Sequence, residues 1–201
     1  MRRPVGRRIT SNNHRQNIIQ AELAVERAFQ AAHARCQQQR PGEGLTGGDQ
    51  QIALIELFLQ AGALGCGAAV AVRLLPAADA GPADLLVADA YVFACPENLA
   101  AVSGVMKDFF DRSYYGALDR INGRAFALLV CAGSDGAGAA RQIARIATGW
   151  RLKAVAEPLI VCTHAQTPEA ILAAKQIGKH DLERCHALGE ALAQGLALGV
   201  F

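Results

Sequence analysis

Two patterns of apolar and polar positions alternate along this chain of 201 residues. Short runs in which nearly every residue is apolar predict strands buried on both faces, whereas apolar residues three and four positions apart predict helices with one buried face. The runs typical of strands are 68–76, 90–95, 123–131 and 156–164. The stretches typical of helices are 15–39, a run from about residue 49 to the glycines at 62–67, a short piece within 80–89, 102–115, 136–150, 168–178 and 181–197.

From residue 46 onward, the predicted helices and strands follow one another in turn. This order predicts an α/β fold with a doubly wound parallel sheet between two layers of helices, which is a three-layer α/β/α architecture. In such sheets, ligands bind outside the carboxyl ends of the strands. The loops that directly follow the strands are therefore the candidate site.

Composition and charge separate the first part of the chain from the rest. Hydrophobic residues make up 52% and charged residues 19%, so the chain can bury a large core. The first forty residues hold eight arginines and only two glutamates, although the net charge of the whole chain is +2. We expect a basic, largely helical extension over 1–45 and one domain over 46–201. Nucleic acid is not an expected partner, because the overall charge is small.

Six cysteines occur without any C-x-x-C pair, and none has the spacing of a structural zinc site, so no metal is expected. The chain shows neither a secretory signal nor an apolar run typical of a membrane span. These observations predict a cytoplasmic protein with reduced thiols. Cys95, Cys131 and Cys162 each end an apolar run, and we expect them to be small buried apolar residues.

The first candidate loop follows the strand at 90–95 and reads Pro96-Glu97-Asn98-Leu99. Pro96 has no N–H to donate, so it ends the strand ladder. Glu97 and Asn98 supply polar groups at the edge of the sheet. Ser103 suits the N-terminal turn of the next helix.

The second candidate loop follows the strand at 123–131 and reads Ala132-Gly133-Ser134-Asp135-Gly136-Ala137-Gly138. Glycines let backbone N–H groups approach a flat ring or an anion closely. The order of glycines, G-x-x-G-x-G, is not the dinucleotide-binding fingerprint. The two loops follow neighbouring strands of the predicted sheet, so together they indicate a site more strongly than either loop alone.

These segments resemble a known family. The stretches "DAYVFACPENLAAVSGVMKDFFDR", "NGRAFALLVCAGSDGAGAARQIARIATGWRLKAVAEPLIV" and "ALAQGLALGVF" are similar to the flavodoxin-like family of NAD(P)H-dependent FMN and quinone reductases, over residues 68–201. The resemblance implies a five-stranded parallel sheet of order 2-1-3-4-5. It also implies FMN as cofactor and NAD(P)H as electron donor.

The resemblance assigns roles to the candidate loops. Residues Pro96, Glu97, Asn98 and Leu99 would line one side of the isoalloxazine ring. The other side would be lined by Ala132, Gly133, Ser134 and Gly136, with Asp135 also counted among the cofactor-binding residues. The best match to the family's phosphate loop is Thr46, Gly47 and Gly48. Tyr114 and Tyr115 could stack near the ring, but we expect them to make core contacts.

The implied function is that of an FMN-binding oxidoreductase that passes electrons from NAD(P)H to a quinone or another small acceptor. This electron transfer needs no catalytic acid, base or nucleophile from the protein. We also expect the chain to form a homo-oligomer. The alternative is a non-catalytic flavodoxin-like module that has lost FMN.

The chain departs from the family ahead of Thr46. The preceding stretch "CQQQRPGEG" is polar and contains a proline, so it does not suit a central buried strand. The other candidate, residues 10–14, follows "VGRRI", which is also a poor core strand. We therefore predict that residues 1–45 do not form the usual central strand. An altered N-terminus, a member that has lost the cofactor and a rearranged member all stay open.

Overall fold

The computed structural model describes residues 63–65, 67–68, 70–173 and 177–201. The helix expected over 15–39 and the phosphate loop expected at Thr46, Gly47 and Gly48 lie outside the described residues. The same holds for the prediction about a central strand in 1–45, and for most of the helix expected from about residue 49.

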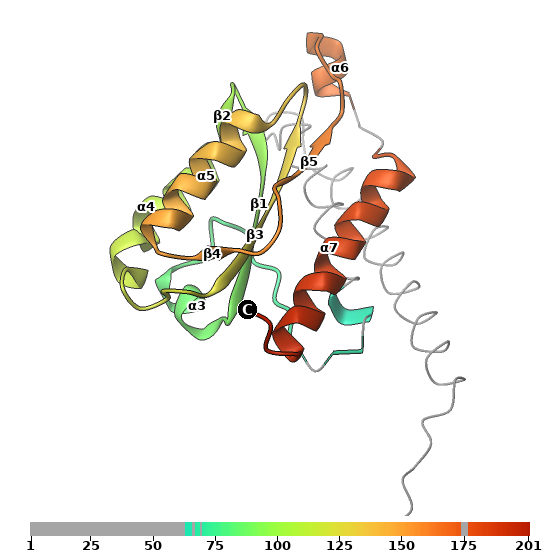
Figure 1. The fold of residues 1–201 in the computed structure, drawn as a ribbon. Helices are drawn as coiled ribbons and strands as arrows, with labels where there is room; N and C mark the ends of the chain where they lie inside the picture. The colour runs from blue at the N-terminus through green and yellow to red at the C-terminus, as the bar shows by residue number, and fades with distance from the viewer. Residues whose placement is uncertain (1–62, 66, 69, 174–176) are drawn as a thin grey trace, which may run out of the picture.

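The described elements follow the predicted order from residue 80 onward (Figure 1). The strands are β1 (Ala90–Asn98), β2 (Ala101–Val102), β3 (Ala125–Ala132), β4 (Lys153–Ala154) and β5 (Leu159–Cys162). The helices are α3 (Pro82–Val87), α4 (Gly104–Ala117), α5 (Ala137–Gly149), α6 (Pro168–Leu172) and α7 (Lys179–Ala197). The two-residue strands β2 and β4 were not predicted; each of the other elements lies within a few residues of its predicted range.

The sheet is built around β3. This strand pairs in parallel with β1 on one side and with β4 and β5 on the other, while β2 pairs antiparallel with the end of β1. Helices α4 and α5 lie on one side of the sheet and α7 lies on the other (Figure 1). The predicted α/β fold with three layers and a mainly parallel sheet is confirmed.

Side chains alternate between the two faces of the strands, as the pleat of a strand requires. Along β1, the side chains of Tyr91, Phe93 and Cys95 join the core beneath α4 and α5, whereas Val92 and Ala94 pack with the core beneath α7. All eight residues of β3 are buried. Because both faces are covered, the sequence of β3 is continuously apolar instead of alternating.

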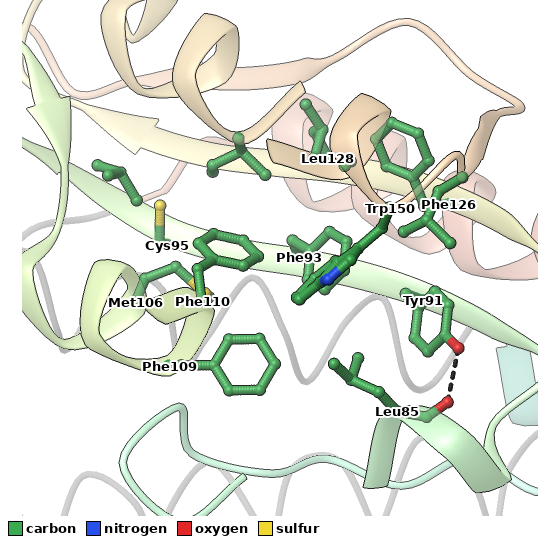
Figure 2. Packing of buried hydrophobic residues seen from close by; sticks show 14 of the residues in the cluster. Leu85, Tyr91, Phe93, Cys95, Met106, Phe109, Phe110, Phe126, Leu128 and Trp150 are labelled. Atoms are coloured by element: carbon green, nitrogen blue, oxygen red, sulfur yellow. Dashed lines mark hydrogen bonds between the residues drawn. The ribbon is translucent and has the colours of Figure 1, made fainter. Parts of the chain in front are cut away.

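An aromatic cluster fills the core between the sheet and helices α4 and α5 (Figure 2). The Phe93 ring meets the Phe110 ring edge-on at 5.3 Å, and the Trp150 ring lies 6.3 Å from Phe93 and 5.6 Å from Phe110. Such pairs contribute about 0.5–1.5 kcal/mol each beyond the area that they bury. Helix α4 supplies its face through Met106, Phe109 and Phe110.

The segment 68–76, predicted as a strand, is not one: its described residues, 68 and 70–76, form no strand. A strand needs a neighbour to pair with. Within the described residues, the edge of β1 opposite β3 carries only β2, at its carboxyl end. Of the expected order 2-1-3-4-5, the described part therefore contains the last three strands, β1, β3 and β5.

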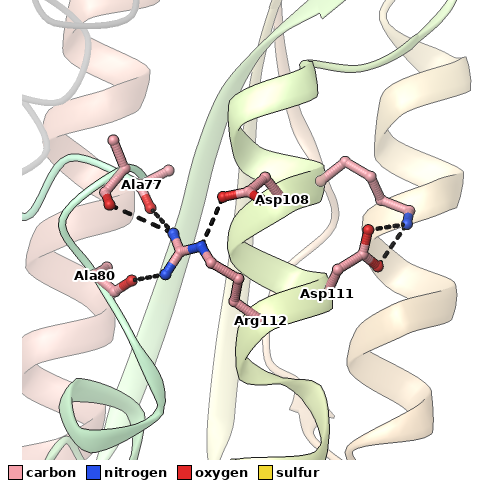
Figure 3. Close-up of polar contacts among 7 residues, drawn as sticks. Ala77, Ala80, Asp108, Asp111 and Arg112 are labelled. Carbon is pink, nitrogen blue, oxygen red and sulfur yellow. Dashed lines mark hydrogen bonds and ion pairs between the residues drawn. The ribbon is translucent and has the colours of Figure 1, made fainter.

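The chain just after this segment is held to α4 by Arg112 (Figure 3). Its guanidinium donates to the carbonyl oxygens of Ala77 at 2.9 Å and Ala80 at 3.1 Å. The same group pairs with Asp108 one turn earlier at 2.6 Å. The helical pattern alone places Arg112 on the solvent face of α4, so its backbone contacts depend on the tertiary structure.

Candidate active site

The two candidate loops meet at the carboxyl ends of neighbouring strands. Strands β1 and β3 are parallel and in register from Ala90 opposite Ala125 to Pro96 opposite Cys131. The residues after Pro96 and after Cys131 therefore leave the sheet at the same edge. This is the edge where β2 and α6 lie in Figure 1. The expectation that the two loops lie together is confirmed.

Pro96, Glu97 and Asn98 belong to a strand instead of the loop expected for them. Pro96 is the last β1 residue paired with β3, so the prediction that it ends that ladder is correct. The chain then continues in β1 and folds back as a hairpin, with Glu97 opposite Val102 and Asn98 opposite Ala101. The prediction missed the hairpin because a two-residue strand such as β2 has no detectable pattern of its own.

The Glu97 carboxylate joins the two loops directly. One of its oxygens accepts a hydrogen bond from the Gly136 N–H at 3.0 Å, and the other accepts one from the Ala139 N–H at 3.2 Å. Gly136 is the N-cap of α5, and Ala139 lies in its first turn. The free N–H groups of a helix N-terminus carry partial positive charge, so a carboxylate there is stabilised. The side chain that was expected at the flavin ring is thus engaged with α5.

Two more contacts fix the hairpin on α5. The Val102 N–H donates to the Gln142 side-chain oxygen at 3.0 Å. A Cβ atom added to Gly138 would lie 2.1 Å from the Ala100 carbonyl oxygen, which is too close for any side chain. Gly138 therefore allows the hairpin to touch the helix. Sequence analysis had counted Gly138 in the glycine loop without this packing role, and it had not singled out Gln142.

The glycines of the second loop also have packing roles. A Cβ atom on Gly133 would lie 2.9 Å from the Ala165 carbonyl oxygen. Gly136 has φ of +73°, and a Cβ atom there would lie 2.6 Å from the Ile160 side chain. The loop therefore rests on the segment after β5, where the Thr163 N–H donates to the Ala132 carbonyl at 2.9 Å. Ala132 and Gly136 are buried beneath it.

Residues 75–166 match the model of a protein family described as NADPH-dependent FMN reductase. Over these residues, a little under half of the chain, the sequence is similar to that family. The matched stretch contains β1, β3, β5 and both candidate loops, and it begins after Thr46, Gly47 and Gly48.

One solved structure supports the fold. A flavodoxin from the domain Archaea is similar with a TM-score of 0.56 and 16% sequence identity, over 72% of this chain and 90% of that chain. The flavodoxin, WrbA-like protein from Agrobacterium tumefaciens aligns with a TM-score of 0.46 and 18% identity, over 58% of this chain and 71% of that one. A search of curated proteins found no match.

As a candidate flavin site, the edge of the sheet offers mixed chemistry. Asn98, Leu99, Ser134 and Asp135 are exposed there and come from the ends of two neighbouring strands. They provide an amide, an apolar side chain, a hydroxyl and a carboxylate. A flavin ring has apolar faces and polar edges, and binding sites for such groups combine apolar contacts with a few placed polar groups. The residues present therefore fit the ring of FMN.

Tyr114 and Tyr115 lie far from this edge. They are in the last turn of α4, which begins beside the hairpin, so about ten residues or roughly 15 Å of helix separate them from its start. Tyr114 stacks on Trp150 at 5.7 Å, which confirms a core contact. Tyr115 is 84% exposed, so the core contact expected for it is wrong. The prediction for Tyr115 failed because the residue follows Tyr114 directly in sequence but lies on a different, exposed side of α4.

The cysteines differ in their environments. Cys95 and Cys131 are buried as expected. Cys162 is only partly buried, because β5 ends there at the candidate site, and its thiol donates to the Ser134 carbonyl at 3.2 Å. Burial, aided by Asp135 and Glu97, raises the pKa of the Cys162 thiol. Burial likewise raises the pKa of Cys185 in α7 to about 11.

We expect Cys162 to react faster with iodoacetamide in the native protein than Cys95, Cys131 and Cys185. Cys162 is partly exposed, whereas the other three thiols are buried. Only the thiolate reacts, so labelling of Cys162 should rise about tenfold between pH 8 and pH 9, below its raised pKa. Peptide mass spectrometry after timed labelling measures both effects. Labelling of Cys185 as fast as Cys162 would contradict the described burial.

No helix among the described residues is long and apolar enough to cross a membrane. Nor do the described residues contain a group of three or more histidine, cysteine, aspartate or glutamate side chains arranged to hold a metal ion.

Proposed function

We propose that the chain binds FMN at the carboxyl edge of β1 and β3, accepts electrons from NAD(P)H and passes them to a quinone or another small acceptor. The observation that carries this proposal is the joining of the two loops by Glu97 in the stretch that matches the FMN reductase family. A site whose two sides are fixed to one another needs little reorganisation when a ring binds, and such preorganisation favours affinity.

In this proposal, the hairpin residues Asn98 and Leu99 contact one side of the ring, and the backbone of Gly133 and Ser134 contacts the other. When bound, FMN supplies the hydride-accepting and electron-donating chemistry. The overall reaction consumes NAD(P)H, one proton and a quinone and yields NAD(P)⁺ and the hydroquinone, so two electrons and two protons reach the acceptor. The protein's residues bind and orient the reactants and do not themselves form covalent intermediates.

The test is a titration of the purified full-length chain with FMN, followed by flavin fluorescence. We expect saturable quenching with one FMN per chain, and bleaching of the bound flavin by NADPH or NADH under nitrogen. Colour should return when menadione is added. A chain that stays colourless in excess FMN would favour the alternative, a non-catalytic module that has lost the cofactor.

We also propose that Thr46 binds the phosphate of FMN. This role is tested by comparing FMN with riboflavin, which lacks the phosphate. If Thr46 and the following glycines bind that phosphate, Thr46→Ala should lose one hydrogen bond to a charged group, about 1.5–3 kcal/mol. FMN affinity should then fall at least tenfold while riboflavin affinity stays the same. Equal losses for both ligands would show that Thr46 acts on the fold and not on the phosphate.

A further inference from the structure

The turn that joins β1 to β2 has an unusual backbone. With Asn98 opposite Ala101, the hairpin has a two-residue turn made of Leu99 and Ala100. Their φ angles are +51° and +61°, so both residues are in the left-handed region. This is the geometry of a type I′ turn, in which both central residues have positive φ.

Leucine and alanine are poorly suited to that geometry. Two-residue turns of this type favour Asn-Gly, Asp-Gly or Gly-Gly, because a Cβ atom crowds the backbone in the left-handed region. A leucine there is strained, and strained residues persist only where the surrounding structure holds them. Such residues gather at active sites and ligand clamps, so an observed outlier motivates a functional hypothesis.

The surroundings that hold the turn come from α5. The Ala100 carbonyl lies against Gly138, and the flanking residues Glu97 and Val102 hydrogen-bond to the helix. These contacts involve the backbone of the turn and its neighbours. They explain how Ala100 is kept in its conformation, but they give no reason for a leucine at position 99.

The Leu99 side chain is fully exposed, at 102% of its reference area. It therefore contributes nothing to the described core while it occupies a strained position. It stands at the tip of the hairpin, beside the exposed Asn98, at the same edge of the sheet as Ser134 in the neighbouring loop. A single leucine among polar neighbours is too small for a protein interface, which needs on the order of 800 Å² per partner. It suits one face of a small apolar molecule.

We propose that Leu99 is a specificity-determining residue that contacts an apolar, planar electron acceptor such as a quinone, on the side of the site open to solvent. This inference rests on the proposed function, because the acceptor must reach a flavin held by the same two loops. The strained turn is the means by which the hairpin presents this side chain.

The test uses the full-length variant Leu99→Asn/Ala100→Gly, which installs the favoured turn sequence and removes the apolar side chain. We expect the thermal unfolding midpoint to rise by about 2–4 °C or more as strain is relieved. FMN affinity is expected to fall as well, because Leu99 contacts one side of the ring in the proposed site, so all kinetics are measured at saturating FMN. The KM for menadione should rise about tenfold, which corresponds to the loss of a mostly buried leucine contact, while the KM for ferricyanide, a polar acceptor, stays unchanged.

Two further variants keep the outcome clear. Leu198→Asn makes the same change at an exposed leucine that follows the C-terminus of α7, and it should leave both KM values unchanged. Leu99→Asn alone should raise the menadione KM as the double variant does. An unchanged menadione KM in FMN-loaded Leu99→Asn would overturn the inference and leave the proposed function standing. A wild-type chain that binds no FMN would overturn both.

Discussion

Replacing Glu97 with alanine is expected to separate the two halves of the candidate site. The change removes both hydrogen bonds to the N-terminus of α5 and leaves the N–H groups of Gly136 and Ala139 without their carboxylate acceptor. Hydrogen bonds to a charged group contribute about 1.5–3 kcal/mol each, and solvent near the partly buried carboxylate reduces that value. We expect the free energy of unfolding in urea to fall by about 2–4 kcal/mol.

The same change should weaken FMN binding by more than tenfold, because the hairpin and the glycine loop lose their fixed spacing. Amide hydrogen exchange is the direct readout: the Gly136 and Ala139 amides should exchange faster, and the interior of β3 should not. Glu97→Gln should lose about half as much stability, since its amide oxygen can accept one of the two bonds while its NH₂ group opposes the other donor.

Glu157→Ala serves as the matched control, because Glu157 is an exposed carboxylate in the loop before β5. Its stability should stay within about 0.5 kcal/mol of wild type. If Glu97→Ala matched this control in both urea unfolding and FMN affinity, the two contacts to α5 would not fix the site.

Replacing Arg124 with methionine is expected to lower the free energy of unfolding about as much as Glu97→Ala does. Arg124 acts at the amino ends of the strands, away from the candidate site. One guanidinium nitrogen of Arg124 donates to the carbonyl oxygens of Leu85 at 2.8 Å, Leu86 at 3.0 Å and Ala88 at 2.5 Å, and it lies 3.0 Å from the Tyr91 hydroxyl. These carbonyls end α3, where the partial negative charge of the helix favours a cation.

Methionine keeps most of the apolar stem of Arg124 but offers no donor, so we expect a loss of about 2–4 kcal/mol in urea unfolding. The Tyr91 pKa gives a second readout. Burial raises it, and the hydrogen bond and charge of Arg124 counteract that rise. In the variant, the pKa of Tyr91 should therefore rise further, which a spectroscopic titration of the phenol can follow.

Arg120→Met is the control for this experiment. Arg120 is exposed and makes one long hydrogen bond of 3.4 Å to the Gly116 carbonyl, so its loss should cost less than 0.5 kcal/mol. Because Arg124 directly precedes β3, at the end of the sheet away from the candidate site, Arg124→Met should lower stability without changing the affinity of the folded protein for FMN. A large loss of affinity at a temperature well below unfolding would contradict this separation.

Several elements can be identified from the local sequence pattern alone, because their pattern does not depend on a distant part of the chain. The apolar runs at 90–95 and 123–131 identified β1 and β3, because a strand covered on both faces is apolar throughout. The spacing in 102–115 identified α4 through one buried face. The order of these elements then required both candidate loops to lie at one edge of the sheet, which the register of β1 and β3 confirmed.

Other features depend on contacts between residues far apart in the chain, so they became visible in the folded structure. Residues 70–76 are apolar enough for a strand, yet pairing requires a neighbour that the local pattern cannot supply. The hairpin after Pro96 is held because N–H groups at the start of α5 donate to Glu97. It can also approach α5 because Gly138 has no side chain that would clash with Ala100. No periodicity in residues 96–102 contains that information. Leucine rarely adopts a positive φ, so local propensity disfavours Leu99 in this turn. Contacts between the hairpin and α5, some forty residues later in the chain, hold it there.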